Sequence, residues 1–63
     1  MKLKIKEMIH KKTGNKYYLL SEDIINATNS NDGQLMCLYM NKNGDLFVRE
    51  TGEFYIKFEE DNL

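Results

Sequence analysis

Four glycines, with the polar residues that precede them, divide this 63-residue chain into short apolar segments. Gly33 and Gly44 complete Asp-Gly and Asn-Gly pairs, whereas Gly14 and Gly52 each follow a threonine. Asp-Gly and Asn-Gly are strong hairpin signals, because these residues tolerate the positive φ angles of tight turns. The chain has no proline that would interrupt the segments between the glycines. The spacing predicts five short strands joined by tight turns.

Three segments alternate side chains with a period of two, which is typical of strands with one buried face. Leu3 and Ile5 alternate with lysines, so we expect a half-buried edge strand whose lysines discourage pairing with other chains. In the C-terminal part, the residues predicted to point inward are Leu46 and Val48 in one strand and Phe54, Ile56 and Phe58 in the next.

Two other segments, residues 16–20 and 35–40, are apolar on both faces. One interpretation is a pair of central strands, each with one side in the core and the other covered by a loop or a terminus. The alternative is an exposed apolar patch that binds a partner or a second copy of the chain. Residues 21–28 are compatible with a helical turn or a bent strand. Their paired isoleucines and Asn-rich end favour an irregular strand.

The length of the chain limits it to one small domain with a thin core. A domain of this size buries only about 60% of the surface that its unfolded form exposes. We predict a single all-β, mainly antiparallel domain over residues 1–63. The number and spacing of the strands favour a small five-stranded SH3-like barrel, with a strongly curled meander sheet as the second choice. The acidic residues 59–63 are expected to form a solvated, frayed tail.

Charge is distributed unevenly along the chain. Residues 1–20 carry six lysines against Glu7, whereas residues 44–63 carry six acidic side chains against Arg49 and Lys57. One interpretation is that the first and last strands lie side by side, with opposite charges facing each other. The alternative is that the basic segment contacts nucleic acid. The net charge of −1 argues against a general nucleic-acid binder.

The residues that could carry chemistry are few. The single cysteine and the single histidine exclude an intramolecular disulfide and a multi-histidine metal site within one chain. Cys37 lies among apolar residues and is interpreted as core packing. His10 has no second histidine to work with and is expected to form a structural hydrogen bond into a turn. We therefore predict no enzymatic activity, no metal site and no cofactor.

An ordered series of short motifs runs through most of the chain. It starts with His10-Lys11-Lys12-Thr13-Gly14, and it closes with Phe47-Val48-Arg49-Glu50, Glu53-Phe54 and Lys57-Phe58-Glu59. Over roughly residues 8–60 this series resembles a family of short bacterial and bacteriophage proteins classed as domain of unknown function 1653. Phe47 stands where that family frequently has Trp, and Glu50 where it frequently has Pro. The resemblance implies a compact β domain, often carried by phage genomes, with no established reaction.

The seven aromatic side chains cannot all fit inside so small a domain, so some must reach the surface. Exposed aromatic residues are common at protein interfaces, and beside cations they also suit stacking with single-stranded nucleic acid. Arg49 is the only arginine, with a planar guanidinium that could pair with Glu53 or stack on Phe47. The candidate binding residues are therefore His10, Lys11, Lys12, Tyr17, Phe47, Arg49, Glu53 and Tyr55.

Two functions are compatible with these residues. The first is a non-enzymatic binding module, which the resemblance implies to be a phage-encoded accessory protein. It would bind and modulate or inhibit a host bacterial protein, such as a component of the defence or transcription machinery. The alternative is a small barrel that binds nucleic acid or a nucleotide. A homodimer is compatible with both. No apolar signal segment or membrane span is apparent, so we expect the bacterial cytoplasm.

Overall fold

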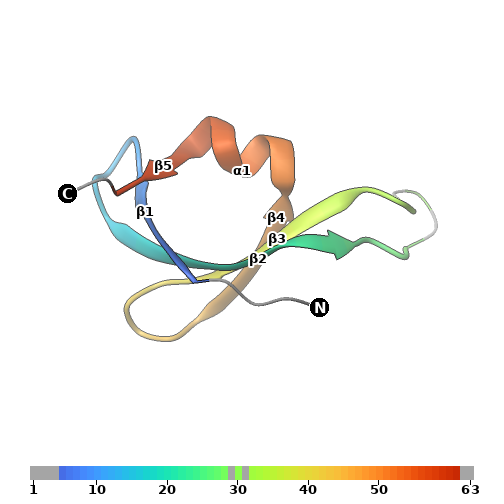
Figure 1. Cartoon of the computed structure of the whole chain (residues 1–63), viewed down its shortest axis with the longest axis horizontal. Coiled ribbons are helices and arrows are strands. Elements are labelled where there is room, and N and C mark those ends of the chain that lie inside the picture. The colour runs from blue at the N-terminus through green and yellow to red at the C-terminus, as the bar shows by residue number, and fades with distance from the viewer. Residues whose placement is uncertain (1–4, 29, 31, 62–63) are drawn as a thin grey trace.

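The computed structural model of this chain describes residues 5–28, 30 and 32–61, and it is dominated by one antiparallel sheet (Figure 1). The elements are β1 (Lys6–His10), β2 (Lys16–Ile25), β3 (Leu35–Met40), β4 (Leu46–Glu50), α1 (Thr51–Lys57) and β5 (Phe58–Glu60). The strands lie in the order β4-β3-β2-β1-β5. The predicted all-β, antiparallel class is confirmed.

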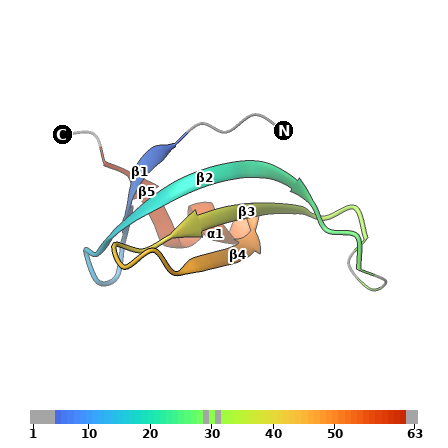
Figure 2. The same cartoon turned by 90° about the horizontal axis from the view of Figure 1, so that it is seen from below.

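The sheet curls but does not close into a barrel. β5 returns to pair with β1, with Ile9 opposite Glu59, so the first and last strands are neighbours as expected. β4 and β5 remain the two edges of the sheet, and α1 connects them across the concave side. Figure 2 shows β2 and β3 bending together along this curve. The sheet is strongly curled, but only β1–β4 form a meander, because α1 carries the chain across to place β5 beside β1.

Three of the four predicted turns form at glycines with positive φ. Gly14, Gly33 and Gly44 have φ angles of 76°, 89° and 85°, a region that residues with a Cβ atom rarely adopt. In the last of these turns, Asn41 N donates to Asp45 O at 3.2 Å and closes the β3–β4 hairpin. Local turn chemistry therefore determines three of the chain reversals.

The expected strand over residues 54–58 is wrong, because most of this segment is helical. α1 begins at Thr51, and the carboxylate of Glu50 accepts hydrogen bonds from the backbone N–H groups of Gly52 and Glu53. Gly52 therefore lies in the first turn of a helix and not in a hairpin. Phe54 is buried on one side of α1, whereas Ile56 is 72% exposed. In a helix, the residues that share one side lie three or four positions apart, so residues 54 and 56 point in different directions.

The predicted inward face of β4 is also wrong. Leu46 and Val48 are 62% and 61% exposed, whereas Phe47 faces Tyr39 and Arg49 faces Cys37 on the concave side. Directly opposed residues in an antiparallel pair share a face. Because Cys37 and Tyr39 lie in the core, their partners on β4 must point toward the concave side.

β1 is not an edge strand, because it lies between β2 and β5. Its buried residue is Met8, and Ile5 precedes the strand and is exposed. Leu3 and its neighbouring lysines lie outside the described residues. From Met8 to His10, β1 is paired on the β5 side as well and presents no outer edge there.

The irregular strand predicted after residue 20 is confirmed as far as Ile25. β2 is ten residues long, and its register with β3 shifts between Leu19 and Ser21 and again between Ser21 and Ile24. Such bulges increase local twist and bend the strand. The β2–β3 hairpin extends beyond the rest of the sheet in both views (Figures 1 and 2).

The core lies between the concave face of the sheet and α1. Its buried members are Met8, Leu19, Cys37, Tyr39, Phe54 and Phe58. On the convex face, Met36, Leu38 and Met40 of β3 are half-buried. β3 is therefore apolar on both faces, as the sequence indicated, and its second face is only partly covered.

The acidic end of the chain is not frayed as far as Asp61. Glu59 and Glu60 belong to β5, and Asp61 N donates to Glu7 O at 3.0 Å. The Asp61 carboxylate also lies 3.1 Å from Lys16 Nζ. The basic and acidic segments therefore do meet, but the contact is made by Lys16 of β2. In the β1–β5 ladder the residues opposite Glu60 and Glu59 are the apolar Met8 and Ile9.

Candidate functional site

A small aromatic pocket opens on the concave side of the sheet. It has a volume of about 150 Å³, and side chains from all five strands line it: His10, Tyr17, Tyr39, Phe47, Arg49 and Phe58. His10 ends β1 and Tyr17 lies near the start of β2, while Phe58 begins β5. The curl of the sheet brings these strand ends together with Tyr39, near the end of β3.

The walls of this aromatic pocket are held by contacts between rings. Tyr39 stacks on Phe47 with centroids 5.4 Å apart, and Phe58 meets Tyr17 edge to face at 5.1 Å. Tyr39 and Phe58 are buried, whereas Phe47 is 39% exposed and forms the rim. Aromatic pairs at these separations attract each other beyond simple burial. The pocket is therefore held in shape by its own rings, and it is open to solvent at Phe47.

Arg49 supplies the positive charge of the pocket and is fixed from two sides. Its Nε donates to the hydroxyl of Tyr39 at 3.2 Å, and its Nη1 donates to the carboxylate of Glu53. The hydrogen bond to Tyr39 is the main cause that raises the pKa of Arg49 further. The predicted pairing of Arg49 with Glu53 is confirmed, and it places an ion pair next to an apolar surface.

His10 is held by its turn. Its Nδ1 lies 3.1 Å from the hydroxyl of Thr13, and its ring meets Phe58 edge to face at 4.9 Å. This is the structural hydrogen bond that the sequence predicted. The imidazole therefore acts as a wall of the aromatic pocket, with one ring nitrogen engaged within the β1–β2 turn.

Two further hollows flank the aromatic pocket, and each shares one lining residue with it. One, of about 250 Å³, is lined by His10, Lys11, Lys12, Ile56 and Lys57. The other, of about 290 Å³, is lined by Asn15, Lys16, Tyr17, Asn41, Lys42 and Asn43. Lys11 and Lys12 thus lie beside the aromatic pocket rather than in it, and both are exposed.

The charge of Lys16 is matched within the chain. Its ammonium lies 2.8 Å from the carboxylate of Glu7 and 3.1 Å from that of Asp61. These two hydrogen bonds raise the pKa of Lys16 well above its usual range. Lys16 therefore contributes less to a basic surface than its position suggests.

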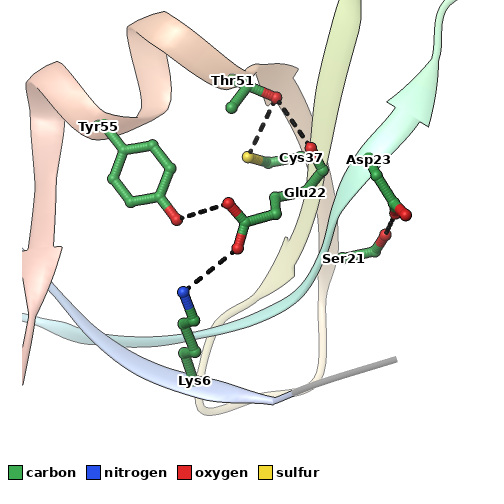
Figure 3. A network of polar contacts seen from close by, with 7 residues as sticks. All are labelled: Lys6, Ser21, Glu22, Asp23, Cys37, Thr51 and Tyr55. Atoms are coloured by element: carbon green, nitrogen blue, oxygen red, sulfur yellow. Dashed lines mark hydrogen bonds and ion pairs between the residues drawn. The ribbon is translucent and has the colours of Figure 1, made fainter. Parts of the chain in front are cut away.

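Tyr55 does not line the aromatic pocket. Its hydroxyl donates to Glu22 Oε1 at 3.1 Å, and Lys6 Nζ donates to the other oxygen of the same carboxylate at 3.3 Å (Figure 3). Burial, followed by the hydrogen bond to Glu22, raises the pKa of Tyr55 to about 12. This contact connects α1 to β1 and β2, which makes Tyr55 a residue that holds the helix in place.

Cys37 belongs to the same region and is part of the core. It is fully buried, and its thiol donates to Thr51 Oγ1 at 3.6 Å, while that hydroxyl donates to the carbonyl of Glu22 at 3.4 Å (Figure 3). Burial is the largest cause that raises the pKa of this thiol. A buried thiol with a raised pKa is a packing residue and a poor nucleophile.

The structure thus brings together four of the predicted binding residues in one pocket, namely His10, Tyr17, Phe47 and Arg49. Glu53 joins them through its ion pair with Arg49. Sequence reasoning missed Tyr39 and Phe58 as pocket residues. The alternation of Tyr39 with Cys37 along β3 was a signal for its inward orientation, but no local signal placed Phe58 next to Tyr17.

No protein-family model, curated protein or solved structure matches this chain. The resemblance to the family of unknown function 1653 therefore stays a prediction from the sequence motifs. Over residues 5–28, 30 and 32–61, no three His, Cys, Asp or Glu side chains are grouped so that they could hold a metal ion. The same part of the chain has no helix of the length and apolar character needed to cross a membrane.

Proposed function

We propose that this chain is a non-enzymatic binding module that accepts a side chain of a protein partner in its aromatic pocket. The observation that carries the proposal is a preformed aromatic wall with a fixed arginine and one exposed rim residue, Phe47. Tyr and Arg are enriched at the energetic centres of protein interfaces. Rings that already pack against each other lose little conformational freedom when a partner binds.

The size of the aromatic pocket supports a protein partner over a free small molecule. Sites for small molecules have volumes of roughly 300–1,000 Å³, whereas this pocket has about 150 Å³. A space of that size suits one apolar side chain projecting from a partner's surface. Glu53 partly balances the charge of Arg49 at the pocket, which favours a partner that inserts a neutral side chain. The guanidinium carries only N–H donors, so it also favours a hydrogen-bond acceptor next to that side chain.

The biological setting of the proposal comes from the sequence resemblance. A phage-encoded accessory protein would act in the cytoplasm of its bacterial host and bind a host protein there. That host protein would be a component of the defence or transcription machinery, which the bound domain would modulate or inhibit. Binding alone achieves such inhibition, because a bound module blocks a surface that the host protein needs.

Affinity capture with pocket variants tests this proposal. Tagged wild-type protein, Phe47→Ala and His10→Ala would be incubated with nuclease-treated bacterial lysate, and retained proteins identified by mass spectrometry. The matched control is Ile25→Ala, which removes an exposed apolar side chain from the far end of β2. We expect one protein retained by wild type and control and lost with both pocket variants. Equal retention by all four chains would contradict a role for the pocket.

A second candidate function is binding of single-stranded nucleic acid or a nucleotide. The observation that favours it is the arrangement of three adjoining hollows, with the aromatic pocket in the middle and lysines on both sides. Aromatic rings flanked by cations suit base stacking with phosphate contacts. This function predicts binding of oligonucleotides that weakens steeply with salt, because phosphate neutralisation releases counterions. An oligonucleotide titration at low and high salt distinguishes the two candidates.

A further inference from the structure

The outer edge of β4 carries three consecutive exposed apolar side chains. Leu46, Phe47 and Val48 are 62%, 39% and 61% exposed, and β4 ends the sheet on this side. Natural edge strands are usually protected by charges, prolines or bulges. Of the charged residues on β4, Arg49 bonds to Glu53, and Glu50 caps α1. This edge is therefore suited to pairing with another strand.

The hydrogen-bonding phase of the β3–β4 hairpin identifies the backbone groups at that edge. Asn41 N donates to Asp45 O, which gives this position the phase of a hydrogen-bonded pair, while Asp45 N donates to the side-chain oxygen of Asn41. Such pairs alternate along an antiparallel ladder, and the register of β3 with β4 has no shift. Phe47 and Arg49 consequently bond toward β3. The N–H and C=O groups of Leu46 and Val48 point to the outer edge.

The side chains of β4 are complementary to those of a second β4 in one antiparallel register. With Phe47 opposite Phe47 of a second copy, Leu46 faces Val48 of that copy, and Asp45 faces its Arg49. Each position then meets its own chemical kind or the opposite charge, which are the favourable cross-strand pairs. We propose that two copies of this chain pair through β4 in this register, about a two-fold axis at Phe47.

The backbone and the charges agree with this register. Leu46 and Val48 become the hydrogen-bonded pairs, so both of their outward N–H and C=O groups are satisfied on each side of the axis. Arg49 uses Nε and Nη1 within its own chain, and a guanidinium has further N–H groups to offer to Asp45 of the second copy. A shift that sets Val48 opposite Val48 would place Leu46 against Glu50, an apolar side chain against a carboxylate.

The pairing also extends the apolar convex face and places the aromatic pockets of the two copies near each other. Leu46 and Val48 continue the half-buried row of Met36, Leu38 and Met40 on β3. Across the axis this row meets its copy, so exposed apolar surface on both chains becomes continuous. Phe47 is at the rim of each aromatic pocket. In the dimer, the two pockets open on the same face and lie on either side of the two Phe47 rings.

Sedimentation velocity of the full chain over a wide concentration range tests the association. We expect a reversible dimer. Val48→Lys, at an exposed position, should weaken association by about tenfold or more, because it removes two symmetry-related apolar pairs. The matched control Ile25→Lys adds the same charge at an exposed site away from β4 and should dimerise like wild type. A wild-type chain that stays monomeric, or a Val48→Lys chain that dimerises normally, would overturn the proposal.

Cysteine cross-linking tests the register. Directly opposed residues at the non-hydrogen-bonded position have Cβ atoms about 4.5–5.5 Å apart, within reach of a disulfide. Phe47→Cys should therefore form covalent dimers under mild oxidation, whereas Leu46→Cys should not, because residue 46 is offset from its own copy. Buried Cys37 is the same in all variants. Preferential cross-linking through Val48→Cys would overturn the register. The cross-linking experiment uses the purified chain alone, so its result does not depend on whether the chain binds a host protein.

Discussion

The ring of Phe54 lies flat against the ring of Phe58, with centroids 4.4 Å apart and planes inclined by 9°. Phe54 is the buried residue of α1, and Phe58 begins β5 and contacts Tyr17 and His10 in the aromatic pocket. This stack joins the helix to the strand that completes the sheet. The buried side chain of Phe54 therefore supports one wall of the pocket from the helix.

We expect Phe54→Ala to destabilise the protein severely. Loss of a fully buried phenylalanine costs about 3–5 kcal/mol, which is comparable to the total stability of a small domain. Urea unfolding followed by circular dichroism would measure the change in the free energy of unfolding. Ile56→Ala is the control on the same helix, because Ile56 is 72% exposed and its truncation should change stability by about 0.5 kcal/mol or less. Similar losses for both variants would contradict the packing described.

The Glu50 cap should contribute measurably to the stability of α1. Its Oε1 and Oε2 accept hydrogen bonds from Glu53 N at 3.0 Å and Gly52 N at 2.8 Å. Glu50→Ala leaves both N–H groups without this partner, and the loss of a cap costs about 1 kcal/mol. Glu50→Gln keeps one side-chain acceptor and should be less harmful than alanine. Thermal unfolding of the three chains would rank them, and an alanine variant as stable as wild type would exclude a capping role.

The strands were predictable wherever the signal was local. Gly14, Gly33 and Gly44 each mark a turn that the backbone adopts with positive φ. The helix was missed because Phe54 and Phe58 satisfy both a period of two and a spacing of four. In the structure the helix is capped by Glu50, and a glutamate is not among the residues preferred at that position. Segment 51–57 therefore carried no strong helix-start signal.

The face of β4 and the make-up of the aromatic pocket depended on tertiary pairing. Leu46, Phe47 and Val48 are all apolar, so alternation alone could not tell which side of β4 faces the core. The register with Tyr39 decides it. His10 and Tyr17 are neighbours across the β1–β2 hairpin, which the turn at Gly14 indicated. Phe47 is two strands away from Tyr17, and the two rings come within 6.4 Å only because the sheet curls.

The contact between Tyr55 and Glu22 predicts a loss of stability at alkaline pH. Burial and the neighbouring carboxylate raise the pKa of Tyr55 from 10.0 to about 12 in the folded protein. Between these values the unfolded chain loses its phenolic proton while the folded chain keeps it, so stability falls as pH rises. Cys37 and Lys16 also have raised pKa values and act in the same direction. The difference between wild type and Tyr55→Phe isolates the tyrosine.

Chemical denaturation at several pH values would measure this difference. The free energy of unfolding of Tyr55→Phe should decline less steeply than that of wild type between pH 10 and pH 12. Glu22→Gln should also reduce the decline, because it removes the charge that a phenolate would face at the hydrogen-bond distance of 3.1 Å. Parallel curves for wild type and Tyr55→Phe would show that the phenol titrates equally in both states.

Cys37 should react with thiol reagents only when the fold opens. Its side chain is fully buried in the core, and burial raises its pKa, so the native protein presents almost no thiolate. We expect slow labelling of the native chain and rapid labelling in denaturant, with the native rate reporting the free energy of opening. Phe54→Ala removes the neighbouring core side chain and should accelerate native labelling, whereas Ile56→Ala should not. Rapid labelling of the native wild-type chain would show that α1 leaves the core accessible.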